Sequence, residues 1–225
     1  LWYRYAAEHA LEAGDPHAVI DRAARGLECG AVEHERGGLL LLACIAHDWL
    51  GETEATERCA LGALDAAREG SAVWLRAAAE LAVVAGRLGN HHLLVGVARD
   101  LARARAGEAR RERVVALAIV ASELLLVGHV DQARRLLERI EDLHDAWSTD
   151  GVAGAWRLRA RGIAALVGGD SVAALTLMQA STTQMEEVGA RRDLASGLTN
   201  IGFLEIMVGR FGEAEATLRR GLALA

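Results

Sequence analysis

The feature that most limits how this chain can fold is a glycine that returns at nearly constant intervals. Each copy follows an apolar run and precedes a polar opening, and the successive intervals are 37, 38, 39, 41 and 40 residues. These six residues, called the anchor glycines below, are Gly14, Gly51, Gly89, Gly128, Gly169 and Gly209. A period of roughly 20 to 50 residues is typical of repeat architectures. We therefore predict an array of about six similar units.

The residues around each anchor glycine repeat as well. The residue seven positions before it is small in every unit: Ala7, Cys44, Ala82, Ala121, Gly162 and Gly202. The residue nine positions after it is apolar in every unit, and the residue five positions after it is small in the last three, Ala133, Ala174 and Ala214. Glycine readily adopts the left-handed conformation that ends a helix, and a small residue lets two helices approach closely. Each unit is therefore predicted to be a helical hairpin that turns at its anchor glycine.

The predicted fold class is all-α, because alanine, leucine, arginine and glutamate dominate and the chain has one proline. First helices are expected near 1–13, 35–50, 72–88, 110–127, 152–168 and 192–208. Second helices are expected near 16–29, 53–69, 90–105, 130–146, 171–188 and 211–225, with caps such as Thr53, Asp170 and Ser171. The units then span 1–30, 35–69, 72–106, 110–146, 152–188 and 192–225 of a single domain.

The sixth unit carries the clearest motif. It reads Asn200-Ile201-Gly202, then Gly209-Arg210-Phe211-Gly212-Glu213-Ala214, then Leu218 and Gly221-Leu222. In these residues the chain resembles the tetratricopeptide repeat family, and the stretch from Gly128 to Ala133 matches in the same way. The other units are more degenerate, and the period exceeds the family's usual length of about 34 residues. The resemblance implies a right-handed α-α superhelix, or solenoid, whose concave groove holds a peptide or a partner helix.

The resemblance also implies which residues line that groove. Carried over by distance from the anchor glycines, the positions are Arg4, Glu8, Leu41, Ile45, Asp48, Trp49, Arg76, Arg87, Ser122, Leu126, Trp156, Arg159, Ile163, Thr199, Phe203 and Met207. Aromatic residues are enriched at binding hot spots, and arginines bind carboxylates through paired hydrogen bonds. The alternative is that the apolar members pack between neighbouring helices and the arginines are solvated.

Arginine-rich, lysine-free arrays of this style resemble the C-terminal regions of large bacterial signalling proteins of the myxobacterial type. In those proteins a Ser/Thr kinase or a STAND-type ATPase precedes the repeats. The resemblance implies a non-catalytic region that binds a protein, a peptide or another part of its own polypeptide, and so regulates a catalytic domain. The first alternative is the ligand-sensing arm of a STAND-type transcription regulator. The second is a helical-repeat enzyme, for which no catalytic constellation is found in the sequence.

Composition excludes several other classes. All 25 basic residues are arginine, which rules out sites that require a lysine, and the net charge of −6 argues against nucleic acid. No run of eighteen apolar residues would span a membrane. Cys29, Cys44 and Cys59 lack metal-ligand spacing and fit a reduced, cytoplasmic setting. The adjacent His91 and His92 point apart on a helix and form no metal motif with His129. No cofactor is expected.

The two ends of the chain are apolar. The first ten residues read LWYRYAAEHA and the last eight read LRRGLALA, without the polar outer face that terminal repeats carry. We therefore expect a fragment of a longer array whose end faces can associate with each other.

Overall fold

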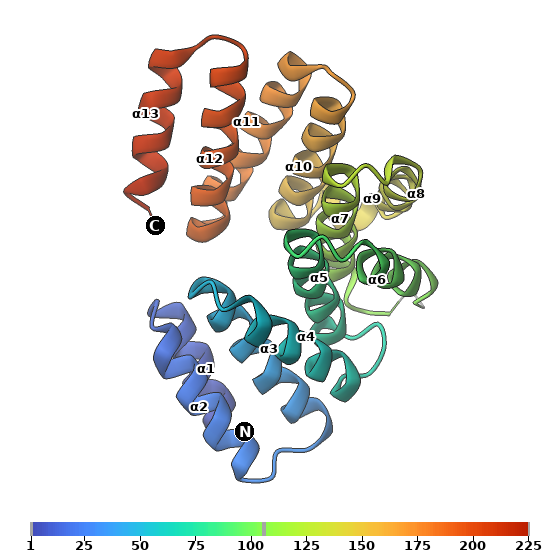
Figure 1. The fold of residues 1–225 in the computed structure, drawn as a ribbon, viewed down its shortest axis with the longest axis vertical. Coiled ribbons are helices and arrows are strands. Elements are labelled where there is room, and N and C mark those ends of the chain that lie inside the picture. The colour runs from blue at the N-terminus through green and yellow to red at the C-terminus, as the bar shows by residue number, and fades with distance from the viewer. Residues whose placement is uncertain (1, 105–106, 225) are drawn as a thin grey trace. The chain divides into compact units, whose positions relative to one another are not determined.

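The computed structural model describes residues 2–104 and 107–224, and it is all-helical there (Figure 1). About 82% of the described residues are helical, and they form thirteen helices without a strand. The helices are α1 (Trp2–Glu12), α2 (Pro16–Glu28), α3 (Glu33–Trp49), α4 (Thr53–Ala66), α5 (Ala72–Arg87), α6 (His91–Arg103), α7 (Arg110–Leu126), α8 (Val130–Glu141), α9 (His144–Ser148), α10 (Gly151–Val167), α11 (Ser171–Glu187), α12 (Arg191–Met207) and α13 (Phe211–Leu222). The predicted all-α fold class is confirmed.

The chain divides into two compact units, and the division falls within α7. Unit 1 is Leu1–Ala116 and unit 2 is Leu117–Ala225. Within unit 1, helices α1 to α6 pack each against the next, and α3 also packs against both α1 and α5. Within unit 2, α10 packs against α8, α9 and α11, and α12 packs against α11 and α13. In Figure 1 the helices joined by a short turn lie side by side, as in the blue pair α1–α2 and the red pair α12–α13.

Each of these turns is built on an anchor glycine. All six anchor glycines have φ between +64° and +87°. At Gly128, the next residue's amide, His129 N, donates to Leu124 O over 2.8 Å, and Gly128 N donates to Leu125 O over 3.1 Å. This pattern closes the end of α7 and satisfies carbonyls that would otherwise lack a partner. The left-handed conformation assigned to these glycines from the sequence is the one they adopt.

The residue after each anchor glycine is the N-cap of the next helix. Asp170 accepts a hydrogen bond from Ala173 N over 2.9 Å, and Asn90 caps α6 in the same way. The expected cap at Asp170 is therefore present. Thr53 and Ser171 are instead the first residues of α4 and α11. They lie one position too far along the chain, because the caps are the residues that directly follow the anchor glycines.

Residues at two fixed distances from the anchor glycines are buried alike. The small residues seven positions before them are all buried, and so are the residues five positions after them, from Val19 in α2 to Ala214 in α13. At Gly202 a β-carbon would lie 2.5 Å from Leu218 Cγ, so α12 and α13 meet there without room for a side chain. Gly202 thus occupies the close helix contact that the sequence predicts.

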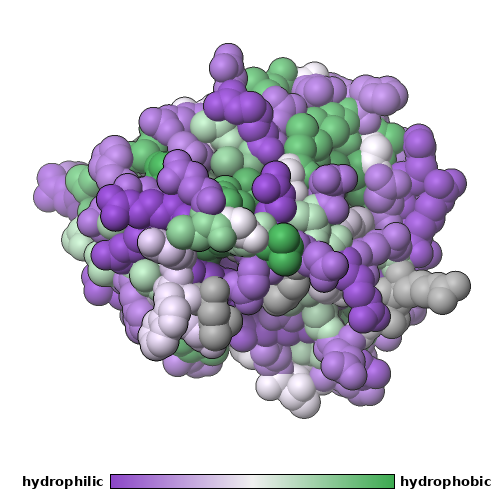
Figure 2. All heavy atoms as spheres, turned by 90° about the horizontal axis from the view of Figure 1, so that it is seen from below, coloured by the Kyte–Doolittle hydropathy of each residue, from purple (hydrophilic) through white to green (hydrophobic). Residues whose placement is uncertain are grey.

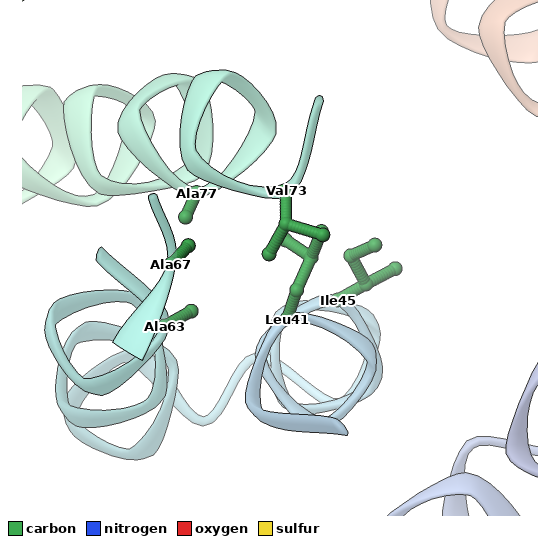
Figure 3. Packing of buried hydrophobic residues seen from close by; sticks show 6 residues of the cluster. All are labelled: Leu41, Ile45, Ala63, Ala67, Val73 and Ala77. Carbon is green, nitrogen blue, oxygen red and sulfur yellow. The ribbon is translucent and has the colours of Figure 1, made fainter. Parts of the chain in front are cut away.

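Small residues also bring α4 and α5 together in unit 1. A cluster of buried side chains joins α3, α4 and α5, and its members are Leu41, Ile45, Ala63, Ala67, Val73 and Ala77 (Figure 3). Ala63 lies on α4 and Ala67 directly follows that helix. Both alanines face Val73 and Ala77 of α5. Methyl groups at these positions allow close helix packing, while the larger side chains of α3 fill the space beside them.

The second helix of the fourth unit differs from its expected range of 130–146. It ends at Glu141, and the short α9 follows it. Trp147 folds back and donates from Nε1 to Ile140 O over 3.0 Å. The Arg157 guanidinium lies 3.9 Å from the centre of the Trp147 ring and makes a paired contact with Glu141 at 2.8–3.1 Å. These contacts hold α8, α9 and α10 together.

Candidate functional site

Unit 1 contains an open pocket lined by the first helices of successive helix pairs. Its volume is about 320 Å³. The lining residues are Arg4, Glu8, Leu11 and Glu12 of α1, Gly38, Leu41, Leu42 and Ile45 of α3, Ala72, Val73 and Arg76 of α5, and Glu112 of α7. Of the residues predicted to line a groove, Arg4, Glu8, Leu41, Ile45 and Arg76 therefore come together here.

The floor of this pocket is apolar and its charges lie around it. Leu41 and Ile45 are buried and belong to the cluster of Figure 3. Arg4 donates from Nε to Glu8 Oε1 over 3.0 Å, and its Nη1 lies 3.9 Å from Glu35 Oε1. These contacts join α1 to α3 and hold Arg4 in place at the pocket. Such a surface offers guanidinium, carboxylate and aliphatic groups within one small space.

Arg76 differs from Arg4 in having its charge free for a partner. Its side chain is exposed at the pocket, and within the described residues it makes neither a hydrogen bond nor an ion pair. Glu112, on the first turn of α7, is half-buried and likewise has no ion-pair partner in the described part of the chain. The pocket thus presents one cation and one anion that no neighbouring side chain neutralises directly.

The other predicted groove residues of unit 1 have different roles. Arg87 of α5 forms an ion pair with Asp48 of α3. Trp49 is half-buried and packs against the cluster formed by α3, α4 and α5. None of these three residues lines the pocket, because they lie at the C-terminal ends of their helices while the pocket lies at earlier turns. Their contacts show how neighbouring first helices are joined to each other.

In unit 2 the predicted groove residues lie on α7, α10 and α12. On α7, Ser122 is buried and donates to Ala118 O over 2.7 Å, whereas Leu126 is exposed. The Arg159 guanidinium lies 4.8 Å from the centre of the Trp156 ring, and its Nη2 donates to Ser196 Oγ over 2.8 Å. Burial lowers the pKa of Arg159, and Asp193 and Glu123 act in the opposite direction. Phe203 and Met207 of α12 are exposed, by 56% and 50%. Figure 2 shows one face of the molecule, on which hydrophobic groups lie between hydrophilic ones.

Two of the three cysteines lie on the packed helices α3 and α4. Cys44 of α3 is buried and Cys59 of α4 half-buried, and burial raises the pKa of both thiols. Within the described residues no group of three or more histidine, cysteine or acidic side chains could hold a metal ion. The same residues contain no helix with the length and apolar character that crossing a bilayer requires.

Sequence reasoning missed Ser196 beside Arg159 and seven of the residues that line the pocket, which are Leu11, Glu12, Gly38, Leu42, Ala72, Val73 and Glu112. Glu112 lies sixteen residues before Gly128, and Ser196 lies thirteen before Gly209. Both belong to first helices, near the starts where the groove positions carried over from the repeat family are sparse. Arg76 and Trp156 also stand thirteen residues before their anchor glycines, so applying that distance to α12 would have found Ser196. Glu112 stands three residues further from its anchor glycine.

Comparison with known proteins adds no relative. No model of a protein family matches this chain, and no curated protein sequence matches it.

Proposed function

We propose that this chain is a non-catalytic scaffold of six tetratricopeptide-like hairpins stacked as a solenoid, which binds a protein or peptide through its first helices. The anchor glycines support this proposal, since the same left-handed turn and the same capping position recur at each of them. The uniform burial seven residues before and five residues after each anchor supports it too. A chain built from one repeated unit presents equivalent helices along one face.

The observation that carries the proposal is the composition of the unit 1 pocket. Every residue that lines it comes from α1, α3, α5 or α7, which are the first helices of four consecutive pairs. Residues from the second helices do not line it within the described chain. A face shared by alternate helices is the surface on which repeat proteins bind extended partners.

The size and chemistry of the pocket favour a peptide. A volume of about 320 Å³ lies at the lower end of the roughly 300–1,000 Å³ typical of small-molecule sites. An aliphatic side chain would fill the floor beside Leu41 and Ile45, while a neighbouring acidic residue would pair with Arg76. We propose that the occupant is a partner protein or another part of the same polypeptide, as in a regulatory region of a multidomain signalling protein.

Selection of peptides on the purified chain tests this function. Twelve-residue peptides are selected from a random display library, and their Kd values are measured by fluorescence anisotropy. Arg76→Glu reverses the free charge at the pocket, and Ala72→Trp fills it, so both are expected to weaken binding by about tenfold or more.

Two variants serve as matched controls. Arg99→Glu makes the same charge reversal on the exposed face of α6, and Ala24→Trp adds the same ring on the exposed face of α2. Neither residue lines the pocket, so both controls should leave the Kd within about twofold. If the selected peptides bind all four variants equally well, the pocket is not the binding site and the proposal is wrong.

A further inference from the structure

Unit 2 contains a guanidinium that is anchored but not neutralised. Arg159 stacks on the Trp156 ring and uses one nitrogen to reach Ser196. Ser196 lies on α12 while the two other residues lie on α10, so the group is fixed between two first helices. A guanidinium carries five N–H donors, and this contact accounts for one nitrogen only.

In the described part of the chain, the charge of Arg159 has no direct counter-ion. Within the described residues no carboxylate lies within ion-pair distance of Arg159, and its hydrogen-bond partner is a neutral hydroxyl. Asp193 and Glu123 influence it at longer range, and burial opposes them by lowering the pKa of the guanidinium. A half-buried cation of this kind is stabilised when a carboxylate binds to it, because the pair then forms away from bulk water.

An exposed strip continues from this cation along α12, polar near the cation and apolar further along the helix. Ser196, Thr199, Phe203 and Met207 follow at intervals of three and four residues, so they share one face of the helix. Ser196 and Thr199 are exposed polar residues, whereas Phe203 and Met207 are large, apolar and at least half exposed. With a rise of about 1.5 Å per residue, Phe203 lies about 10 Å and Met207 about 16 Å from the level of Ser196.

We propose that unit 2 binds an acidic and apolar peptide segment, whose carboxylate pairs with Arg159 and whose large apolar side chains cover Phe203 and Met207. The cation and the strip define the partner's chemistry and its spacing. A free amino acid or a small dicarboxylate would reach Arg159 but leave the strip uncovered. This site is distinct from the pocket of unit 1, and the inference stands even where the proposed function of that pocket fails.

Designed peptides test this site directly. Each is a capped, fluorescein-labelled helix of alanine and glutamine that carries one glutamate and two leucines. The leucines stand seven and eleven residues from the glutamate. The peptide is made in both sequence directions, and each version has a counterpart with glutamine in place of the glutamate. Measured by anisotropy at low ionic strength, one of the glutamate peptides is expected to bind the full chain about tenfold more tightly than its counterpart.

Variants of the chain separate this site from the rest of the surface. Arg159→Gln should abolish the preference for glutamate, and Phe203→Ser should weaken the glutamate and glutamine peptides alike. Arg161→Gln is the matched control, because Arg161 is exposed on the same helix and faces Glu141 at 3.7 Å. Arg99→Glu, on the exposed face of α6 and outside both sites, should likewise leave binding unchanged.

A measurement on the wild-type chain alone can already overturn the inference that a carboxylate binds to Arg159. If both glutamate peptides bind no more tightly than their glutamine counterparts, the inference is overturned, whether or not Arg159→Gln folds. A preference for glutamate that survives in a folded Arg159→Gln chain would also overturn it, since the carboxylate would then bind elsewhere.

Discussion

Replacing Gly202 by alanine measures how closely α12 and α13 pack. The new β-carbon would lie 2.5 Å from Leu218 Cγ and 2.6 Å from Leu218 Cδ2. Alanine in place of a helical glycine stabilises by about 1 kcal/mol, whereas overpacking of a tight contact costs about 1–3 kcal/mol. Leu218 cannot simply swing its tip away, because the clash involves the carbon at which its side chain branches. We expect Gly202→Ala to destabilise the chain by about 0–2 kcal/mol.

Gly212 provides a matched control in the same pair of helices. It lies in the first turn of α13, and a β-carbon there would meet nothing within 4 Å. Gly212→Ala should therefore be neutral or stabilising by about 0.5–1 kcal/mol. Urea unfolding followed by circular dichroism gives the free energy of unfolding for each variant.

A double-mutant cycle identifies the cause of the effect. In a Leu218→Ala background the clashing atoms are gone, so Gly202→Ala should become stabilising by about 1 kcal/mol. The reasoning is refuted if Gly202→Ala stabilises the wild-type chain as much as Gly212→Ala does. It is also refuted if the effect of Gly202→Ala is the same with and without Leu218.

Three further outcomes are expected. Gly128→Ala should cost about 1–2 kcal/mol in urea unfolding, because φ is +86° and open space surrounds the position, so the cost is conformational rather than steric. Asp170→Ala should cost about 1 kcal/mol through loss of its hydrogen bond to Ala173 N, whereas Asp170→Asn should cost much less; equal losses would argue against capping. Burial raises the pKa of the Cys44 thiol, so it stays protonated at pH 8 and should react with a thiol reagent only on unfolding, while exposed Cys29 reacts at once; reaction of all three thiols in the folded chain would contradict this.

The helix boundaries could be predicted because the signals that set them are local. A glycine with positive φ followed by a capping residue, as in Gly169-Asp170, fixes the end of one helix and the start of the next within a few residues. Close contacts such as Gly202 could be predicted for a similar reason, since a small residue at a fixed distance from the turn repeats in every unit. The break between α8 and α9 escaped prediction, because it depends on Trp147 reaching back to Ile140 and on Arg157 of the following helix.

The groove residues were less predictable than the helices that carry them. Arg76 and Arg87 are both arginines of α5 that the sequence predicts to line the groove. In the structure Arg87 pairs with Asp48, whereas Arg76 lines the pocket. The difference depends on which side chain of α3 lies within reach, and that cannot be worked out from one helix alone. Arg113 shows the same limit, because it stands in the run of charged residues from Arg110 to Arg113 but is buried and donates to Ala104 O over 2.8 Å.

The packing of each helix against its neighbours in sequence has a consequence for how the chain folds. Within each unit, contacts join helices that are adjacent or separated by one other helix, so only short stretches of chain must be ordered to form them. Contacts that close short loops lose little chain entropy, and proteins rich in them fold fast. Folding can then begin at any pair and spread to the next. Hydrogen exchange should accordingly reveal pairs that open one at a time, with the lowest protection where a pair has a single neighbour.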